Sequence, residues 1–178
     1  MFRLREKVVY PGHGVAYIND ILERNVAGTP TTFYELKFLH KDMTVLVPTH
    51  NAEAAGIRPL SSTETINDAL KVLTQPARKL HHYEFTASNW NKRNKEYQAK
   101  LRTGNIRDLS EIYRDLCYIA TQKELSFGEK NLLHHIESLL VEEIALVRQL
   151  NEDQAVAELR AVFNHTIMPI STQTSRVL

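Results

Sequence analysis

A short basic stretch follows the only tryptophan of the chain, in SNWNKRNKEYQAKLRTG (residues 88–104). The spacing predicts a helix from about residue 89 to residue 102, stopped by Gly104. One acidic side chain, Glu96, is set against five basic ones: Lys92, Arg93, Lys95, Lys100 and Arg102. Such side chains on a short helix neutralise phosphates without sequence preference. The stretch therefore indicates polyanion binding, with an ordinary solvated helix face as the alternative.

The tryptophan itself, Trp90, has two interpretations. With Tyr97 and Leu101 it forms an i, i+7, i+11 stripe, which is typical of a helix face directed at a core. It also lies in the first turn of the predicted helix, where an indole can project past the helix end. Periodicity leaves both interpretations open.

The eight histidines show no metal-binding spacing. His81–His82 and His134–His135 are adjacent pairs, and neighbours on a helix diverge by about 100°, so neither pair chelates a metal by itself. There is no HExxH motif and no Cys/His cluster. The PGHG segment (residues 11–14) lacks the further glycines and the following helix of a phosphate loop, so it is predicted to be a turn. We expect no catalytic residue, no metal and no cofactor.

The single cysteine, Cys117, lies in the apolar segment LCYIA and is predicted to be a buried small residue. One cysteine cannot form an intrachain disulfide, which suits a reducing compartment. The sequence contains neither a signal-peptide pattern nor an apolar run long enough to cross a bilayer. We therefore expect a cytoplasmic protein without membrane contact.

The net charge of +1 hides an uneven distribution. Residues 71–107 carry 9 basic and 2 acidic side chains, whereas residues 108–160 carry 5 basic and 11 acidic ones. A basic block of this kind favours a polyanionic partner, and the acidic block is typical of solvated helix faces.

Partial period-two patterns and turn residues predict short strands before residue 61. The segments are KVVY (7–10), VAYINDI (15–21), TFYELKFL (32–39), MTVLVP (43–48) and IRPL (57–60). Four or five short strands in about 55 residues suit a small, strongly bent antiparallel barrel of the SH3 or Tudor type.

Helical spacing replaces the strand pattern after Leu60. Ser61 and Glu64 form a capping-box pattern before a first helix, and SFGE (126–129) forms a second before a long one. The predicted helices cover 66–73, 89–102, the region around 109–119, 126–147 and 152–163. The fold class is α+β, with a β-barrel domain at 1–60, an all-α helical bundle at 61–163 and a loose tail at 164–178.

Several stretches of the chain resemble the CarD family of bacterial transcription regulators, also called CdnL. They are KVVYPGHGV, FYELKF, DMTVLVP, NAEAAGIRPL, NWNKR, KLRTGN, EIYRDL and LSFGEK, in matching order and spacing over about 140 residues. The resemblance implies a Tudor-like RNA polymerase-interacting domain followed by a compact helical domain. The first domain is also similar to the polymerase-binding module of transcription–repair coupling factors.

For the first domain, the resemblance implies docking on the β subunit of RNA polymerase. The polymerase contacts carry over to Arg24, Val26 and Leu46, the last at a position where some relatives have a basic residue. The alternative is a non-enzymatic Tudor-type scaffold that binds another protein partner.

For the helical domain, the resemblance implies sequence-nonspecific contact with promoter DNA in the minor groove beside the melted region. Trp90 acts there as a wedge at the upstream edge of the bubble, and Lys92, Arg93 and Lys95 are the basic contacts. The expected function is a monomeric regulator of transcription initiation that stabilises promoter open complexes and joins the nucleoid through polymerase.

Overall fold

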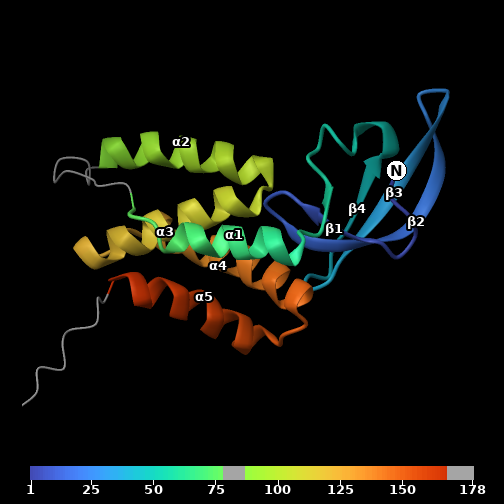
Figure 1. The fold of residues 1–178 in the computed structure, drawn as a ribbon. Helices are drawn as coiled ribbons and strands as arrows, with labels where there is room; N and C mark the ends of the chain where they lie inside the picture. Colours follow the sequence, from blue (N-terminus) through green and yellow to red (C-terminus); the bar gives the residue numbers. More distant parts are fainter. Residues whose placement is uncertain (78–86, 168–178) are drawn as a thin grey trace, which may run out of the picture.

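The computed structural model of the chain describes residues 1–77 and 87–167. Within them, a five-stranded antiparallel sheet is followed by five α-helices. Figure 1 shows the strands gathered at one end of the molecule and the helices at the other. Each part has its own buried apolar cluster, one formed by strand residues such as Ile18 and Leu36 and one formed by helix residues such as Ile112 and Ile136.

The sheet has the strand order β4-β3-β2-β1-β5, with β4 and β5 at its edges. The strands are β1 (Lys7–Tyr10), β2 (Gly14–Val26), β3 (Thr29–Phe38), β4 (Thr44–Pro48) and β5 (Arg58–Pro59). A single 3₁₀ turn, η1 (Thr49–Asn51), follows β4. The predicted small antiparallel fold is confirmed.

The β2–β3 hairpin is longer than the sequence predicted. β2 continues five residues beyond Ile21, and its outer half is mostly exposed on both faces, so no apolar alternation marks it. Ala27 and Gly28 form the tip with φ values of 50° and 85°. Two consecutive positive φ angles match the twist of a two-residue hairpin turn. The strands therefore pair out to Val26 and Thr29.

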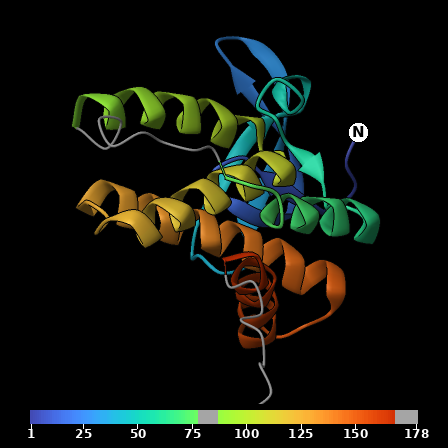
Figure 2. The same cartoon turned by 60° about the vertical axis from the view of Figure 1, so that its left-hand side comes forward.

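The helices are α1 (Thr63–Leu73), α2 (Ala87–Thr103), α3 (Ile106–Gln122), α4 (Phe127–Arg148) and α5 (Glu152–Ile167). α2 and α5 lie on opposite sides of α3 and α4 in both views (Figures 1 and 2). The predicted core stripe of α3 is buried: Leu109, Ile112, Leu116 and Ile119. The strands end at Pro59 and the helices begin at Thr63, while a division into separate domains at residue 61 stays a prediction.

Two helix ends differ from the prediction. α1 is capped by Ser62, whose hydroxyl accepts a hydrogen bond from the Thr65 amide, and not by Ser61. The amide of Ser61 instead donates to the Glu143 carboxylate, a partner too far along the chain for a local pattern to indicate. α5 runs to Ile167, four residues beyond its predicted end at residue 163, and the remaining tail residues (168–178) lie outside the described residues.

Cys117 is partly buried and packs against the helical core, next to Tyr113 on α3. Burial raises the pKa of its thiol to about 12, so the side chain is a neutral thiol near neutral pH. A neutral, sheltered thiol is a weak nucleophile, which agrees with a packing role.

Candidate nucleic-acid interface

Trp90 occupies the first turn of α2 and is partly buried, so neither sequence interpretation describes it fully. One edge of its indole rests on α4 at Gly128, where an added Cβ would lie 3.4 Å from Cζ2 of the ring. The ring also packs at the border of the helical core, while Tyr97 and Leu101 of the same stripe are buried inside it. The indole is therefore held at Gly128 and against the helical core, and only part of it reaches solvent.

Arg93 is buried, with only 4% of its surface exposed, so this structure does not present it to solvent as the predicted phosphate contact. Its guanidinium forms an ion pair with Glu129 of α4, with an Nη2–Oε1 distance of 3.2 Å. Its Cζ atom also lies 6.0 Å from the centre of the Trp90 ring, within the range of a cation–π contact. Arg93 therefore supports the tryptophan from inside the bundle.

Glu129, the ion-pair partner of Arg93, is 1% exposed and accepts several hydrogen bonds. Besides Arg93, it accepts hydrogen bonds from the amide and hydroxyl of Ser126 (2.8 and 2.9 Å) and from Lys123. Burial alone would raise the pKa of its carboxyl, but the hydrogen bonds from Lys123 and Ser126 outweigh burial and hold the pKa below its usual value. The sequence indicated the Ser126–Glu129 capping box, which is confirmed, but not its link to Arg93.

The remaining basic side chains of α2 fall into two groups. Lys92, Lys95 and Arg102 are exposed. Lys100 instead donates a hydrogen bond to Glu111 of α3, which helps to hold the pKa of that carboxyl below its usual range. Lys92 and Lys95 are thus the predicted phosphate contacts that α2 presents to solvent.

Phe127 is a further exposed aromatic residue, and the sequence did not identify it as a site residue. It is the first residue of α4, it is 81% exposed, and it directly precedes the Gly128 that contacts Trp90. Its only sequence signal is an apolar residue immediately after an N-cap serine. We call the set Trp90, Lys92, Lys95 and Phe127 the α2–α4 surface. Both helices begin at the end of the bundle farthest from the strands (Figure 1).

The predicted polymerase contacts lie on the sheet. Arg24 and Val26 are exposed near the tip of the β2–β3 hairpin, and both precede the turn by only a few residues. Leu46 is partly buried on the edge strand β4, opposite Glu35 of β3. The structure thus groups Arg24 with Val26 and places Leu46 on the other side of β3.

The described histidines do not form a metal centre. In the part of the chain that the structure describes, no three His, Cys, Asp or Glu side chains are grouped to hold a metal ion. The Nε2 atom of His135 forms a hydrogen bond with the backbone oxygen of Gly12 at 3.0 Å. His81–His82 lie outside the described residues. Among the described helices, none is long and apolar enough to span a membrane.

Comparison with known proteins gives two family matches that together cover most of the chain. Residues 2–61 match the family described as "CarD-like/TRCF RID domain", and residues 68–160 match "CarD, C-terminal domain". The chain is also similar to a Bacillus subtilis (strain 168) protein named "Putative transcription factor YdeB". The two are 26% identical over 154 residues, which cover 86% of this chain and 97% of the relative.

Proposed function

This chain belongs to the CarD family of transcription regulators, and we propose that it acts at initiation by stabilising promoter open complexes. In this proposal the strand part docks on the β subunit of RNA polymerase, and the α2–α4 surface contacts DNA at the upstream edge of the bubble. The match of residues 2–61 to the RID domain supports an interaction with polymerase.

The observation that carries the DNA contact is the combination of a supported tryptophan with exposed cations. Gly128 and Arg93 fix one side of the Trp90 indole, so little side-chain entropy remains to be lost when it binds. A bubble edge is a base step that is already unstacked, so inserting an aromatic there costs less than opening intact duplex. Lys92 and Lys95 add phosphate contacts that do not depend on sequence.

Docking on polymerase explains how so small a DNA surface can act. A tether raises the local concentration of the surface near the promoter, so weak intrinsic DNA binding suffices. A factor that binds the open complex more tightly than the closed one shifts the equilibrium toward the open state.

A fluorescent promoter-melting assay with purified polymerase tests this function. We expect the full chain to raise the melted fraction and to lengthen the lifetime of the open complex. The same chain should be retained on immobilised β subunit. A chain that binds polymerase but leaves melting unchanged would support the scaffold alternative instead.

We expect Lys95→Ala to make DNA binding less dependent on salt. With Lys92 and Lys95 as the phosphate contacts, the log–log salt slope should be about −1.8, at roughly −0.9 per contact. Removing one contact should bring the slope to about −0.9. Lys71→Ala, the same change at an exposed lysine of α1, serves as the control and should leave the slope as it is. An unaltered slope for Lys95→Ala would remove that residue from the interface.

We expect Arg24→Glu to weaken binding to the β subunit by about tenfold or more, because reversing a charge at a docking surface costs several kcal/mol. Arg24 is exposed on β2, so the melting temperature should change little. Lys37→Glu is the matched control, since it makes the same charge change on β3. It lies six residue pairs along the ladder from Arg24, or about 20 Å. Equal loss of binding in both variants would point to net charge rather than a local contact.

A further inference from the structure

The strand part and the helical part are joined by a partly buried ion pair between Arg58 of β5 and Glu143 of α4. Arg58 donates two parallel hydrogen bonds, Nη1 to Oε1 at 2.7 Å and Nη2 to Oε2 at 2.8 Å. Glu143 is 2% exposed and accepts a third hydrogen bond from the Ser61 amide at 2.9 Å. A two-pronged contact between planar groups fixes their relative orientation as well as their distance.

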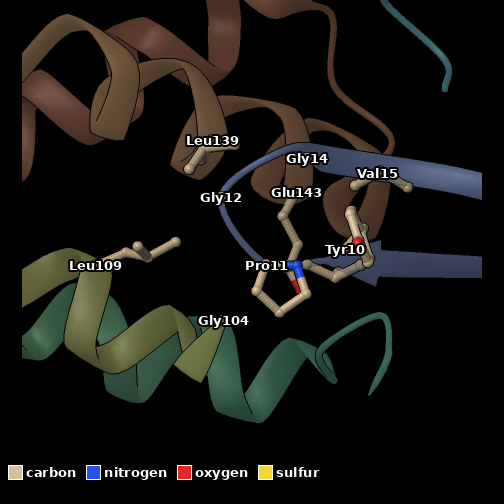
Figure 3. Close-up of a pocket in the computed structure, with 10 residues that line it drawn as sticks. Tyr10, Pro11, Gly12, Gly14, Val15, Gly104, Leu109, Leu139 and Glu143 are labelled. Carbon is tan, nitrogen blue, oxygen red and sulfur yellow. The ribbon is translucent and has the colours of Figure 1, made fainter. Parts of the chain in front are cut away.

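The same arginine also holds the end of α2. Its Nε atom donates to the backbone oxygen of Gly104, directly after the last residue of the helix, at 2.8 Å. Pro11, from the turn between β1 and β2, lies against Gly104 and Gly56, where added Cβ atoms would come within 2.8 and 2.9 Å of its Cγ. Figure 3 shows Pro11 beside Gly104. Only glycine permits this approach, so α2 is fixed to the sheet from two sides.

The β1–β2 turn makes further contacts with α4. The Nε2 atom of His135 is hydrogen-bonded to the backbone oxygen of Gly12. The Glu142 carboxylate occupies the space that a Cβ atom on Gly14 would need. The PGHG segment is therefore a turn, as predicted, but one whose small residues let the helices pack directly on the strands. It shares this junction with Arg58 and Glu143.

The junction lies at the opposite end of α2 from Trp90. Fourteen residues separate Trp90 from Gly104, which is about 21 Å of helix at 1.5 Å per residue. A tilt of about 10° at the junction would move the indole by about 3.7 Å, which is about one base-pair step of roughly 3.4 Å. Reaching one chosen step therefore requires that the angle at the junction be held closely.

We propose that Arg58 and Glu143 are positioning residues that set the angle of the helical part to the strand part. This angle determines which base step Trp90 reaches while the strand part is held by polymerase. The proposal rests on the function proposed above and adds a requirement to it: the two binding surfaces must be joined rigidly as well as being present.

The test replaces both partners, with Arg58→Met and Glu143→Met in one full-length chain. Removing one partner alone would strand a buried charge, whereas replacing both with apolar side chains is often tolerated. The control is Arg148→Met with Glu158→Met, which removes an Arg–Glu pair that lies within the helical part, between α4 and α5. A photo-crosslinking phenylalanine derivative at position 127 reports the DNA position that the surface reaches.

We expect the Arg58/Glu143 double variant to bind forked DNA and isolated β subunit within about twofold of the wild type. In the complete polymerase–promoter complex, its crosslinks should spread from one base step to several, and the open-complex lifetime should fall about tenfold. The control pair should keep both properties. Arg58→Lys keeps Glu143 paired but removes the planar two-pronged contact, so it should broaden the crosslinks even if the double variant fails to fold.

Three results would overturn the proposal: a single crosslink position with full lifetime in the Arg58 variants, an equal loss in the control pair, or a loss matched by weaker binding to either partner alone. A wild-type chain that neither crosslinks near the bubble nor lengthens the open-complex lifetime would contradict the proposed function itself.

Discussion

Replacing Trp90 by Ala should remove most of the open-complex stabilisation while costing only about 1–2 kcal/mol of folding free energy. Truncating a fully buried tryptophan typically costs about 3–5 kcal/mol, from lost transfer energy and the cavity left behind. Trp90 is partly buried, so part of that cost is absent. Denaturant unfolding measures the first quantity, and open-complex lifetime measures the second.

Leu133→Ala is the matched control for stability. Leu133 is also partly buried against the helical core, but it lines the pocket next to Phe163 of α5. We expect a similar loss of stability with no loss of promoter melting. Trp90→Phe should keep part of the activity, because a smaller aromatic can still fill an unstacked step. If Trp90→Ala keeps a full open-complex lifetime, or loses it only in proportion to the unfolded fraction, the indole is not a wedge.

The elements that the sequence predicted well are those with a strong local pattern. Each of these patterns involves only a few neighbouring residues. Examples are the buried stripe of α3, the capping box at Ser126 and the glycine stop at Gly104. The outer half of β2 was missed because it lacks such a local pattern. Its residues are mostly exposed on both faces, so only the pairing with β3 identifies it as a strand.

The site could be predicted only in part, because its geometry depends on contacts between distant residues. Arg93 looked like one more surface cation of α2, and its burial follows from Glu129, 36 positions later in the chain. The edge of the Trp90 indole that is held rests on Gly128, which no helical pattern connects to it. Pro11 and Gly104 likewise meet across more than half of the chain. Each of these is a tertiary contact, and local periodicity cannot predict contacts between residues that are distant in the sequence.

Replacing Glu129 by Ala should have the largest effect on stability, about 3–5 kcal/mol, because it removes one partner of a buried ion pair. The same change removes the capping box of α4 and the hydrogen bond from Lys123. Glu124→Ala is the control. Glu124 is an exposed carboxylate between α3 and α4, and it forms an ion pair with Lys130. Unfolding by denaturant at neutral pH should show a large loss for Glu129→Ala and little change for Glu124→Ala.

Acid unfolding gives an independent test of the Glu129 charge. Hydrogen bonds from Lys123 and Ser126, acting against burial, hold the pKa of Glu129 in the folded chain below its ordinary value of 4.5. A carboxyl whose pKa is lowered by folding stabilises the fold above the unfolded value, and this stabilisation is lost as the pH falls through the folded value. The difference in unfolding free energy between wild type and Glu129→Gln should therefore be constant above about pH 5.5 and shrink below about pH 4.5. Other titrating carboxyls, such as Glu137 and Glu142, are common to both proteins and cancel in the difference. A difference that stays constant down to acid unfolding would mean that the Glu129 charge does not hold Arg93, and with it Trp90, in place.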